Sequence, residues 1–148
     1  MNVNESHAAL TGLEQLRALI AAGRPAPIGI TLGFALTEVS EGRAVFTATP
    51  DERFYNPIGS IHGGYAATLL DSACGCSVHS RLSATQAYTT LELKVAYHRG
   101  MTRDTGPVRA EGRVLSFGRR VAFAEATLTD GKGQLYASAT STLLVFER

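Results

Sequence analysis

The sequence predicts an α+β fold in which an antiparallel sheet of five or six strands wraps one long central helix. Three observations carry this prediction. Two short strand-like runs come first, a long proline-free segment rich in Ala and Leu follows at 62–82, and the rest of the chain alternates β-rich runs with glycine-containing breaks. Because the long helix is too apolar to lie on the surface, the sheet is expected to cover it.

A first helix is expected near the N-terminus, where apolar residues recur at intervals of three and four from Leu13 to Ile20. It should end near Gly23, ahead of Pro25, and pack on an edge of the sheet. The same spacing, together with the lack of a basic leading segment, argues against a secretory signal peptide. No apolar run is long enough to span a bilayer, so we expect a soluble, cytoplasmic protein that does not bind membranes.

The strands are predicted from composition and from the turns between them. Residues 33–39 and 43–49 form a hairpin pattern around the turn Ser40-Glu41-Gly42. After the long helix, four β-rich runs are separated by Gly-containing breaks and are expected to form a meander; they span 85–98, 107–116, 120–129 and 134–146.

Length and charge limit the function classes. With 148 residues, 45% of them hydrophobic, we expect a single domain over 1–148, with residues 1–24 as an N-terminal helical extension. The 14 basic and 13 acidic residues nearly cancel, which argues against nucleic acid as a partner. Cys74 and Cys76 lie on different faces of the expected helix and have no further metal ligands nearby, so we interpret them as structural, with no metal site.

Asp71 does not fit its surroundings. From residue 54 to residue 80 it is the only formal charge, in a helix otherwise expected to be buried. A buried carboxylate without partners costs several kcal/mol, so such a residue is usually paired or set in a cleft for chemistry. The structural alternative is an exposed Asp71, or one satisfied by Ser72 or Thr68.

The start of the same helix is a second candidate feature. Gly63 and Gly64 leave backbone N–H groups uncovered at the positive end of the helix dipole, where an oxyanion can bind, although two glycines at a helix start can also be a simple packing contact. Gly63 and Asp71 are eight residues apart, about 12 Å along the helix axis. One helix cannot direct both at the same carbonyl carbon, whereas two antiparallel helices can, so we expect an obligate homodimer.

These residues resemble a known family. The run 56–64 (NPIGSIHGG), followed by Asp71 and Gly75, is similar to the motif of hotdog-fold acyl-CoA thioesterases of the phenylacetyl-CoA and 4-hydroxybenzoyl-CoA (PaaI-like) type. The similarity extends over roughly 30–146. It implies a hotdog fold, hydrolysis of an acyl-CoA thioester, no cofactor apart from the coenzyme A of the substrate, and a homotetramer built from dimers.

The resemblance also implies roles for single residues. Asp71 would be the nucleophile or the general base, and the family leaves both possibilities open. The Gly63 N–H would polarise the thioester carbonyl from the facing subunit, Asn56 would position the carbonyl or the water, and His62 would order the loop. His62 could equally serve only to cap the helix.

Coenzyme A would lie along strands near the dimer edge, which maps onto a set of polar and basic residues. Arginines in this set suit phosphates, although the two consecutive ones could simply belong to a solvated turn. The implied substrate-binding residues are Gly64, Thr90, His98, Arg99, Ser116, Gly118, Arg119 and Arg120. Gly75 stands where one branch of the family carries a hydroxyl, and Ser72 is a candidate substitute.

The acyl group is left open by the sequence. An aromatic acyl-CoA is the first expectation, with medium-chain fatty and 3-hydroxyacyl groups as alternatives. The acyl pocket is expected to be built from Phe54, Tyr65 and Thr68 and from strand residues of two chains. Two other functions fit the same fold: an acyl-CoA hydratase or dehydratase, and a non-catalytic acyl-CoA-binding module. The spacing from His62-Gly63-Gly64 to Asp71 favours hydrolysis over both.

Overall fold

The computed structural model describes residues 10–148, and the first nine residues of the predicted N-terminal extension lie outside the described part. The elements follow in the order α2 (Gly12–Ala22), α3 (Pro27–Leu32), β1 (Phe34–Ser40), β2 (Arg43–Ala48), η1 (Glu52–Phe54), α4 (Gly63–His79), β3 (Gln86–Tyr97), η2 (Arg103–Thr105), β4 (Val108–Phe117), β5 (Val121–Asp130) and β6 (Leu135–Glu147).

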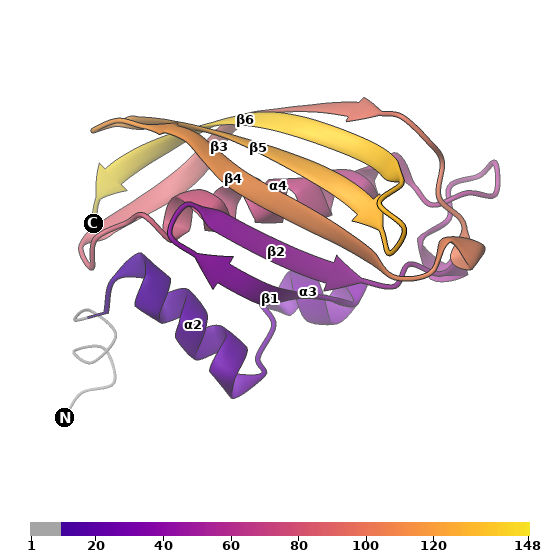
Figure 1. Ribbon diagram of the computed structural model, residues 1–148, viewed down its shortest axis with the longest axis horizontal. Helices are drawn as coiled ribbons and strands as arrows, with labels where there is room; N and C mark the ends of the chain where they lie inside the picture. The colour runs from indigo at the N-terminus through magenta and orange to yellow at the C-terminus, as the bar shows by residue number, and fades with distance from the viewer. Residues whose placement is uncertain (1–9) are drawn as a thin grey trace.

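The six strands form one antiparallel sheet in the order β1-β2-β4-β5-β6-β3. Figure 1 shows α4 lying along the inner side of the curved sheet, with α2 and α3 below the β1 edge. This is the α+β arrangement predicted from the sequence, and α2 packs on an edge strand as expected. The short helix α3 and the 3-10 turns η1 and η2 were not predicted.

The core lies between α4 and the sheet and is built from small side chains. Along β5 the buried positions alternate with exposed ones, and the inward residues Ala122, Ala124 and Ala126 are buried. At Gly112 on β4 an added Cβ would overlap the backbone of α4. These small residues let the helix approach the sheet closely, which fixes the position of the middle of α4.

Candidate active site

Asp71 lies in the middle of α4 and is partly buried. Its Oδ1 atom accepts a hydrogen bond of 3.0 Å from the hydroxyl of Thr90 on β3. Thr68 instead donates to the carbonyl oxygen of Gly64, at 2.8 Å. Among residues 10–148 no Lys, Arg or His side chain forms an ion pair with Asp71. The carboxylate is therefore oriented by a neutral donor, an arrangement that suits an attacking base or nucleophile.

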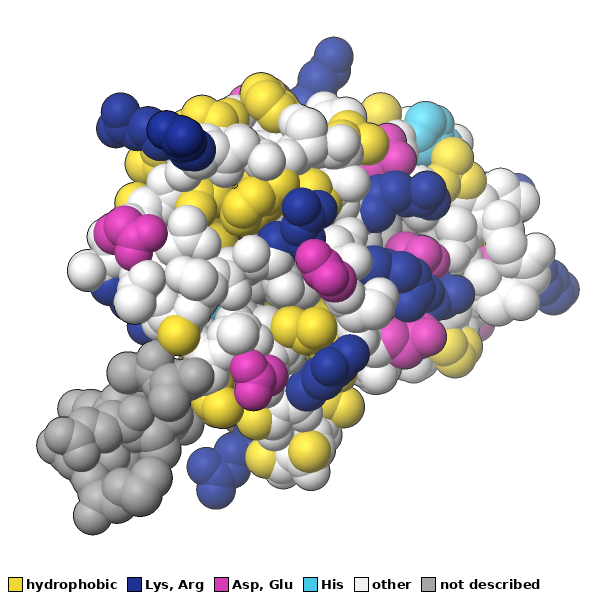
Figure 2. Space-filling view, turned by 60° about the vertical axis from the view of Figure 1, so that its left-hand side comes forward, with side chains coloured by type: hydrophobic (Ala, Val, Ile, Leu, Met, Phe, Trp, Pro, Cys, Tyr) yellow, Lys and Arg dark blue, Asp and Glu magenta, His cyan; other side chains and the backbone are white. Residues whose placement is uncertain are grey.

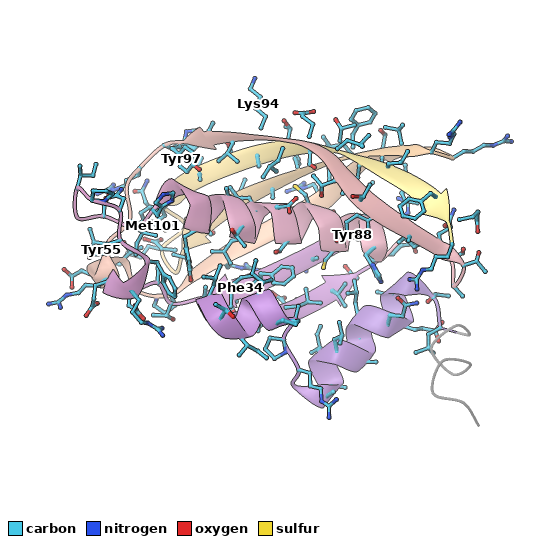
Figure 3. The ribbon with its side chains drawn as sticks, turned by 180° about the vertical axis from the view of Figure 1, so that it is seen from behind. Phe34, Tyr55, Tyr88, Lys94, Tyr97 and Met101 are labelled. Carbon is cyan, nitrogen blue, oxygen red and sulfur yellow. The ribbon has the colours of Figure 1, made fainter. Side chains whose placement is uncertain are left out.

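A pocket of about 310 Å³ opens beside Asp71 and Ser72. Most of its lining is apolar and comes from α2, α3, β1 and β2, with Cys76 and Tyr88 next to the two polar residues. Figure 3 shows the side chains of Phe34 and Tyr88 near α4, in the region where α2 and α3 approach it. Asp71 and Arg24 are the charged residues of this otherwise mostly apolar lining. An apolar pocket with a few polar groups is a common arrangement for an active site.

Tyr88 is a pocket residue that the sequence analysis did not single out. It lies against Gly75, where an added Cβ would overlap the phenol oxygen. Burial raises the pKa of Tyr88, and the charge of Asp71 contributes to the rise. No local motif marks this tyrosine, and only the pairing of β3 beside α4 brings it to the pocket.

Two cysteine thiols near Asp71 on α4, those of Cys74 and Cys76, are also desolvated. Burial, followed by the charge of Asp71, raises the pKa of Cys74 and of Cys76 to about 12. Both cysteines are free; Cys74 is buried and Cys76 is partly buried. Residues 10–148 contain no group of three His, Cys, Asp or Glu side chains that could hold a metal ion.

The N-terminus of α4 carries an unused donor. His62 caps the helix, because its Nδ1 atom accepts a hydrogen bond of 2.8 Å from the N–H of Gly64. Within the described part of the chain the N–H of Gly63 donates to no acceptor. Tyr97 from β3 donates to the Gly63 carbonyl oxygen at 2.6 Å, which holds this peptide in place. Of these two N–H groups, that of Gly63 is therefore available to bind an oxyanion, whereas that of Gly64 is already used by His62.

Asn56 organises the loop before α4. Its Oδ1 accepts hydrogen bonds from the N–H groups of Ile58 and Ser60, both at 3.1 Å, and its Nδ2 donates to the Ser60 hydroxyl at 3.1 Å. His62 is tied to the same loop through its N–H, which donates to the carbonyl oxygen of Phe54 at 2.8 Å. In a single chain these contacts shape the loop that presents Gly63.

The sheet register places the two candidate features at opposite ends of the fold. Thr90 pairs with Leu143, which pairs with Ala122, which pairs with Phe117, so Asp71 shares its end with the β4–β5 turn. Tyr97, which binds Gly63, lies at the other end of β3. Within one chain the carboxylate and the free N–H are thus apart, as their spacing on the helix requires.

The basic residues predicted to bind coenzyme A divide in the same way. Four of the predicted residues lie exposed at or near the β4–β5 turn, on the Asp71 side: the two arginines Arg119 and Arg120, together with Ser116 and Gly118. In Figure 2, where this end comes forward, basic side chains border a hydrophobic patch.

His98 and Arg99 follow β3 on the Gly63 side and bind their own chain. His98 Nε2 lies 2.8 Å from the hydroxyl of Ser138, and Arg99 donates to the side-chain oxygen of Gln134 at 3.1 Å. Together with Gly63, His98 and Arg99 line a second hollow of about 250 Å³.

Phe54, Tyr65 and Thr68, which were predicted to contribute to the acyl pocket, are separate from the Asp71 pocket in a single chain. These residues line a hollow of about 290 Å³ with His62 and Gly64. The rings of Phe54 and Tyr65 stack with their centroids 4.8 Å apart. The sequence could not show that Asp71 instead faces α2 and α3, because that contact depends on how the N-terminal segment folds back.

Comparison with known proteins shows a family match and relatives that share 24% and 29% identity with this chain. The model of the thioesterase superfamily matches residues 58–137. The 1,4-dihydroxy-2-naphthoyl-CoA hydrolase of Listeria monocytogenes is 24% identical over 115 residues, covering 78% of this chain and 92% of the relative. The proofreading thioesterase EntH of Klebsiella pneumoniae is 29% identical over 103 residues, covering 70% and 74%.

Solved structures show the same fold. A thioesterase family protein from Silicibacter pomeroyi aligns with a TM-score of 0.80 and 26% identity over 93% of this chain and 99% of that one. A phenylacetic acid degradation-related protein from Ralstonia eutropha aligns with a TM-score of 0.77 and 26% identity over 87% and 98%. A Streptococcus mutans protein bound to acetyl-CoA has a TM-score of 0.70 and 26% identity over 78% and 90%.

Proposed function

Because the chain belongs to the thioesterase superfamily and is a hotdog-fold thioesterase, we propose that it hydrolyses an aromatic acyl-CoA to the free acid and coenzyme A, with Asp71 as the catalytic carboxylate. The observation that carries the proposal is the Asp71 carboxylate, which has no ion-pair partner within residues 10–148, lies at the edge of a mostly apolar pocket and is oriented by Thr90. The names of the naphthoyl-CoA hydrolase and the acetyl-CoA complex support acyl-CoA as the substrate class.

Two routes use the same groups. As a general base, Asp71 accepts a proton from water while the water oxygen attacks the thioester carbon, and the tetrahedral oxyanion then expels the coenzyme A thiolate. As a nucleophile, Asp71 attacks the carbon itself, the thiolate leaves, and water hydrolyses the resulting anhydride. In both routes the carbonyl oxygen gains negative charge, and the free N–H of Gly63 is suited to stabilise it. Neither route requires a cofactor or a metal.

The oxyanion donor would come from a second copy of the chain. Strand β3 has a neighbour on one side only, and its Leu91 and Tyr97 side chains are more than half exposed. An edge of this length favours pairing with another strand. A two-fold axis beside β3 would bring the Asp71 end of one chain to the Gly63 end of its partner, and would unite Arg119 with the partner's Arg99 around one coenzyme A.

Assembly and location complete the proposal. We propose a homodimer as the unit that carries the site, and a homotetramer of two dimers as the solution state. None of the helices in residues 10–148 is long and apolar enough to cross a membrane. We further propose that the enzyme acts in the cytoplasm.

The first experiment measures free-thiol release from a panel of aromatic and aliphatic acyl-CoAs. Asp71→Asn keeps the size and hydrogen-bonding capacity of the side chain but removes its charge, so kcat should fall by about 10³-fold or more while substrate still binds. Asp104→Asn makes the same chemical change on a carboxylate that is 89% exposed, and should retain wild-type activity. Near-wild-type turnover by Asp71→Asn would overturn the proposed mechanism.

Co-expression of two inactive variants tests the shared site. Gly63→Pro removes the free N–H at a helix position that accepts proline, while Gly63→Ala keeps the N–H and controls for crowding against Tyr97. In a mixed dimer of Asp71→Asn and Gly63→Pro chains, one of the two sites would hold both wild-type groups. Random mixing should then restore about a quarter of wild-type activity. No recovery in isolated mixed dimers would mean that both groups act within one chain.

A further inference from the structure

The pocket beside Asp71 is closed by the N-terminal helices of the same chain. Leu16 and Ile20 from α2 and Ile28 from α3 line it together with Phe34 and Phe46 of the sheet. The family match begins at residue 58, so this wall lies outside the matched region. The pocket therefore combines a catalytic carboxylate on α4 with a wall that belongs to the N-terminal segment.

Helix α2 is held firmly at its first turn. An added Cβ on Gly12 would overlap the carbonyl of His79, and the N–H of Gly12 donates to the carbonyl oxygen of Leu82 at 3.0 Å. Gln15 pairs with the ring of His79 at 2.9 Å, which ties α2 to the end of α4. The wall is thus anchored to the same helix that carries Asp71.

Helix α3 is fixed separately, and the link between the two helices spans the pocket. An added Cβ on Gly29 would overlap the carbonyl oxygen of Phe34, so α3 rests directly on the start of β1. Gly23 ends α2 in the left-handed conformation, with φ of 62°, and the link from Gly23 to Ala26 also lines the pocket. A wall supported at both ends defines a limited space.

The size and lining of this space indicate what it holds. Its volume of about 310 Å³ is about twice that of the roughly 150 Å³ cavity known to hold one benzene ring. Phe34 and Phe46 form an edge-to-face pair with centroids 5.8 Å apart, and Tyr88 adds a third ring to the lining. Aromatic faces and edges of this kind suit a flat aromatic ligand.

We propose that the α2–α3 segment is the specificity wall of the enzyme and that it selects an acyl group of two fused aromatic rings over a single ring. This inference rests on the proposed function, because it places the acyl group in the pocket that Asp71 borders. Ile20 and Ile28 set the depth available to the second ring, while the thioester carbonyl remains beside Asp71.

The test compares 2-naphthoyl-CoA with benzoyl-CoA in wild type and two variants of α2. Ile20→Trp fills the far part of the pocket and should lower kcat/KM for 2-naphthoyl-CoA by about tenfold or more, while benzoyl-CoA changes by less than about threefold. Ala21→Trp adds the same indole at the next residue, which is exposed and outside the lining, and should leave both values near wild type. Circular dichroism and thermal melting confirm that the variants are folded.

The outcomes separate this inference from the proposed function. Thiol release by wild type with a preference for the two-ring substrate, lost selectively in Ile20→Trp, supports the wall. Hydrolysis that prefers benzoyl-CoA, or an equal effect of Ile20→Trp on both substrates in a folded protein, overturns the wall but leaves Asp71 catalysis in place. No hydrolysis of any acyl-CoA by wild type overturns the proposed function, and the wall with it.

Discussion

Replacing Thr90 by Val should separate the orientation of Asp71 from its chemistry. Val has nearly the same shape as Thr and suits a strand, but it removes the donor that lies 3.0 Å from Oδ1 of Asp71. A hydrogen bond to a charged acceptor contributes about 1.5–3 kcal/mol. If that orientation is needed chiefly in the transition state, kcat should fall by a factor between about 10 and 150, with little change in KM.

The assay is steady-state thiol release, with two companion variants. Thr90→Ser keeps the hydroxyl and should recover most of the lost kcat. Thr89→Val makes the same change on the adjacent residue, which is exposed and points to the other side of the strand, and should have no effect. A raised KM with unchanged kcat in Thr90→Val would show that Thr90 binds substrate instead of orienting Asp71, and unchanged kinetics would refute both roles.

Three further predictions concern the frame around the site. Gly112→Ala should lower the free energy of unfolding by about 3 kcal/mol, because its Cβ overlaps the α4 backbone, whereas Gly131→Ala, with open space around it, should change it by less than about 1 kcal/mol; urea denaturation checks both. Burial, and secondarily the charge of Arg148, lowers the pKa of His79 in the folded protein. The contribution of the neutral His79 side chain to the free energy of unfolding is therefore complete above about pH 6.5 and is lost as the pH falls below that value. Wild type should therefore lose more Tm between pH 8 and pH 5 than His79→Gln does, and equal losses would contradict this. The thiols of Cys74 and Cys76, with pKa values of about 12, should react with iodoacetamide at pH 8 roughly 10³-fold more slowly in the folded protein than in the unfolded chain. Folded and unfolded rates within tenfold of each other would count against the burial of these thiols.

The helices and strands with strong periodicity could be predicted from the sequence. The long helix and the four strands after it fall within a few residues of their predicted bounds, because each is long and ends at Gly or at a turn. Helix α3 was missed because its six residues begin with Pro and include a Gly, so it is too short to show a helical period.

The candidate site also contains residues that a local sequence pattern marks and residues that only the fold brings into place. Asp71 and Gly63 could be found because each is unusual within its own stretch of sequence: a lone charge in one case, a pair of glycines at a helix start in the other. The hydrogen bond from Thr90 to Asp71 depends on the register of β3 against β6 and on the depth of α4, which no local pattern encodes. The same holds for Tyr88, whose approach to the pocket depends on a glycine thirteen residues earlier.

The two parts of the proposed active site face different demands on precision. Asp71 and Thr90 must hold the reacting atoms to within about 0.5 Å, and they sit on the central helix and on a strand, which are rigid elements. The wall that selects the acyl group needs only the right volume, because excluding one ring depends on overlap and not on alignment. It is accordingly built from α2 and α3 at the β1 edge, where a change in one side chain can alter the space without moving the carboxylate. Selectivity should therefore change readily through α2 and α3, whereas turnover should depend on α4 and β3.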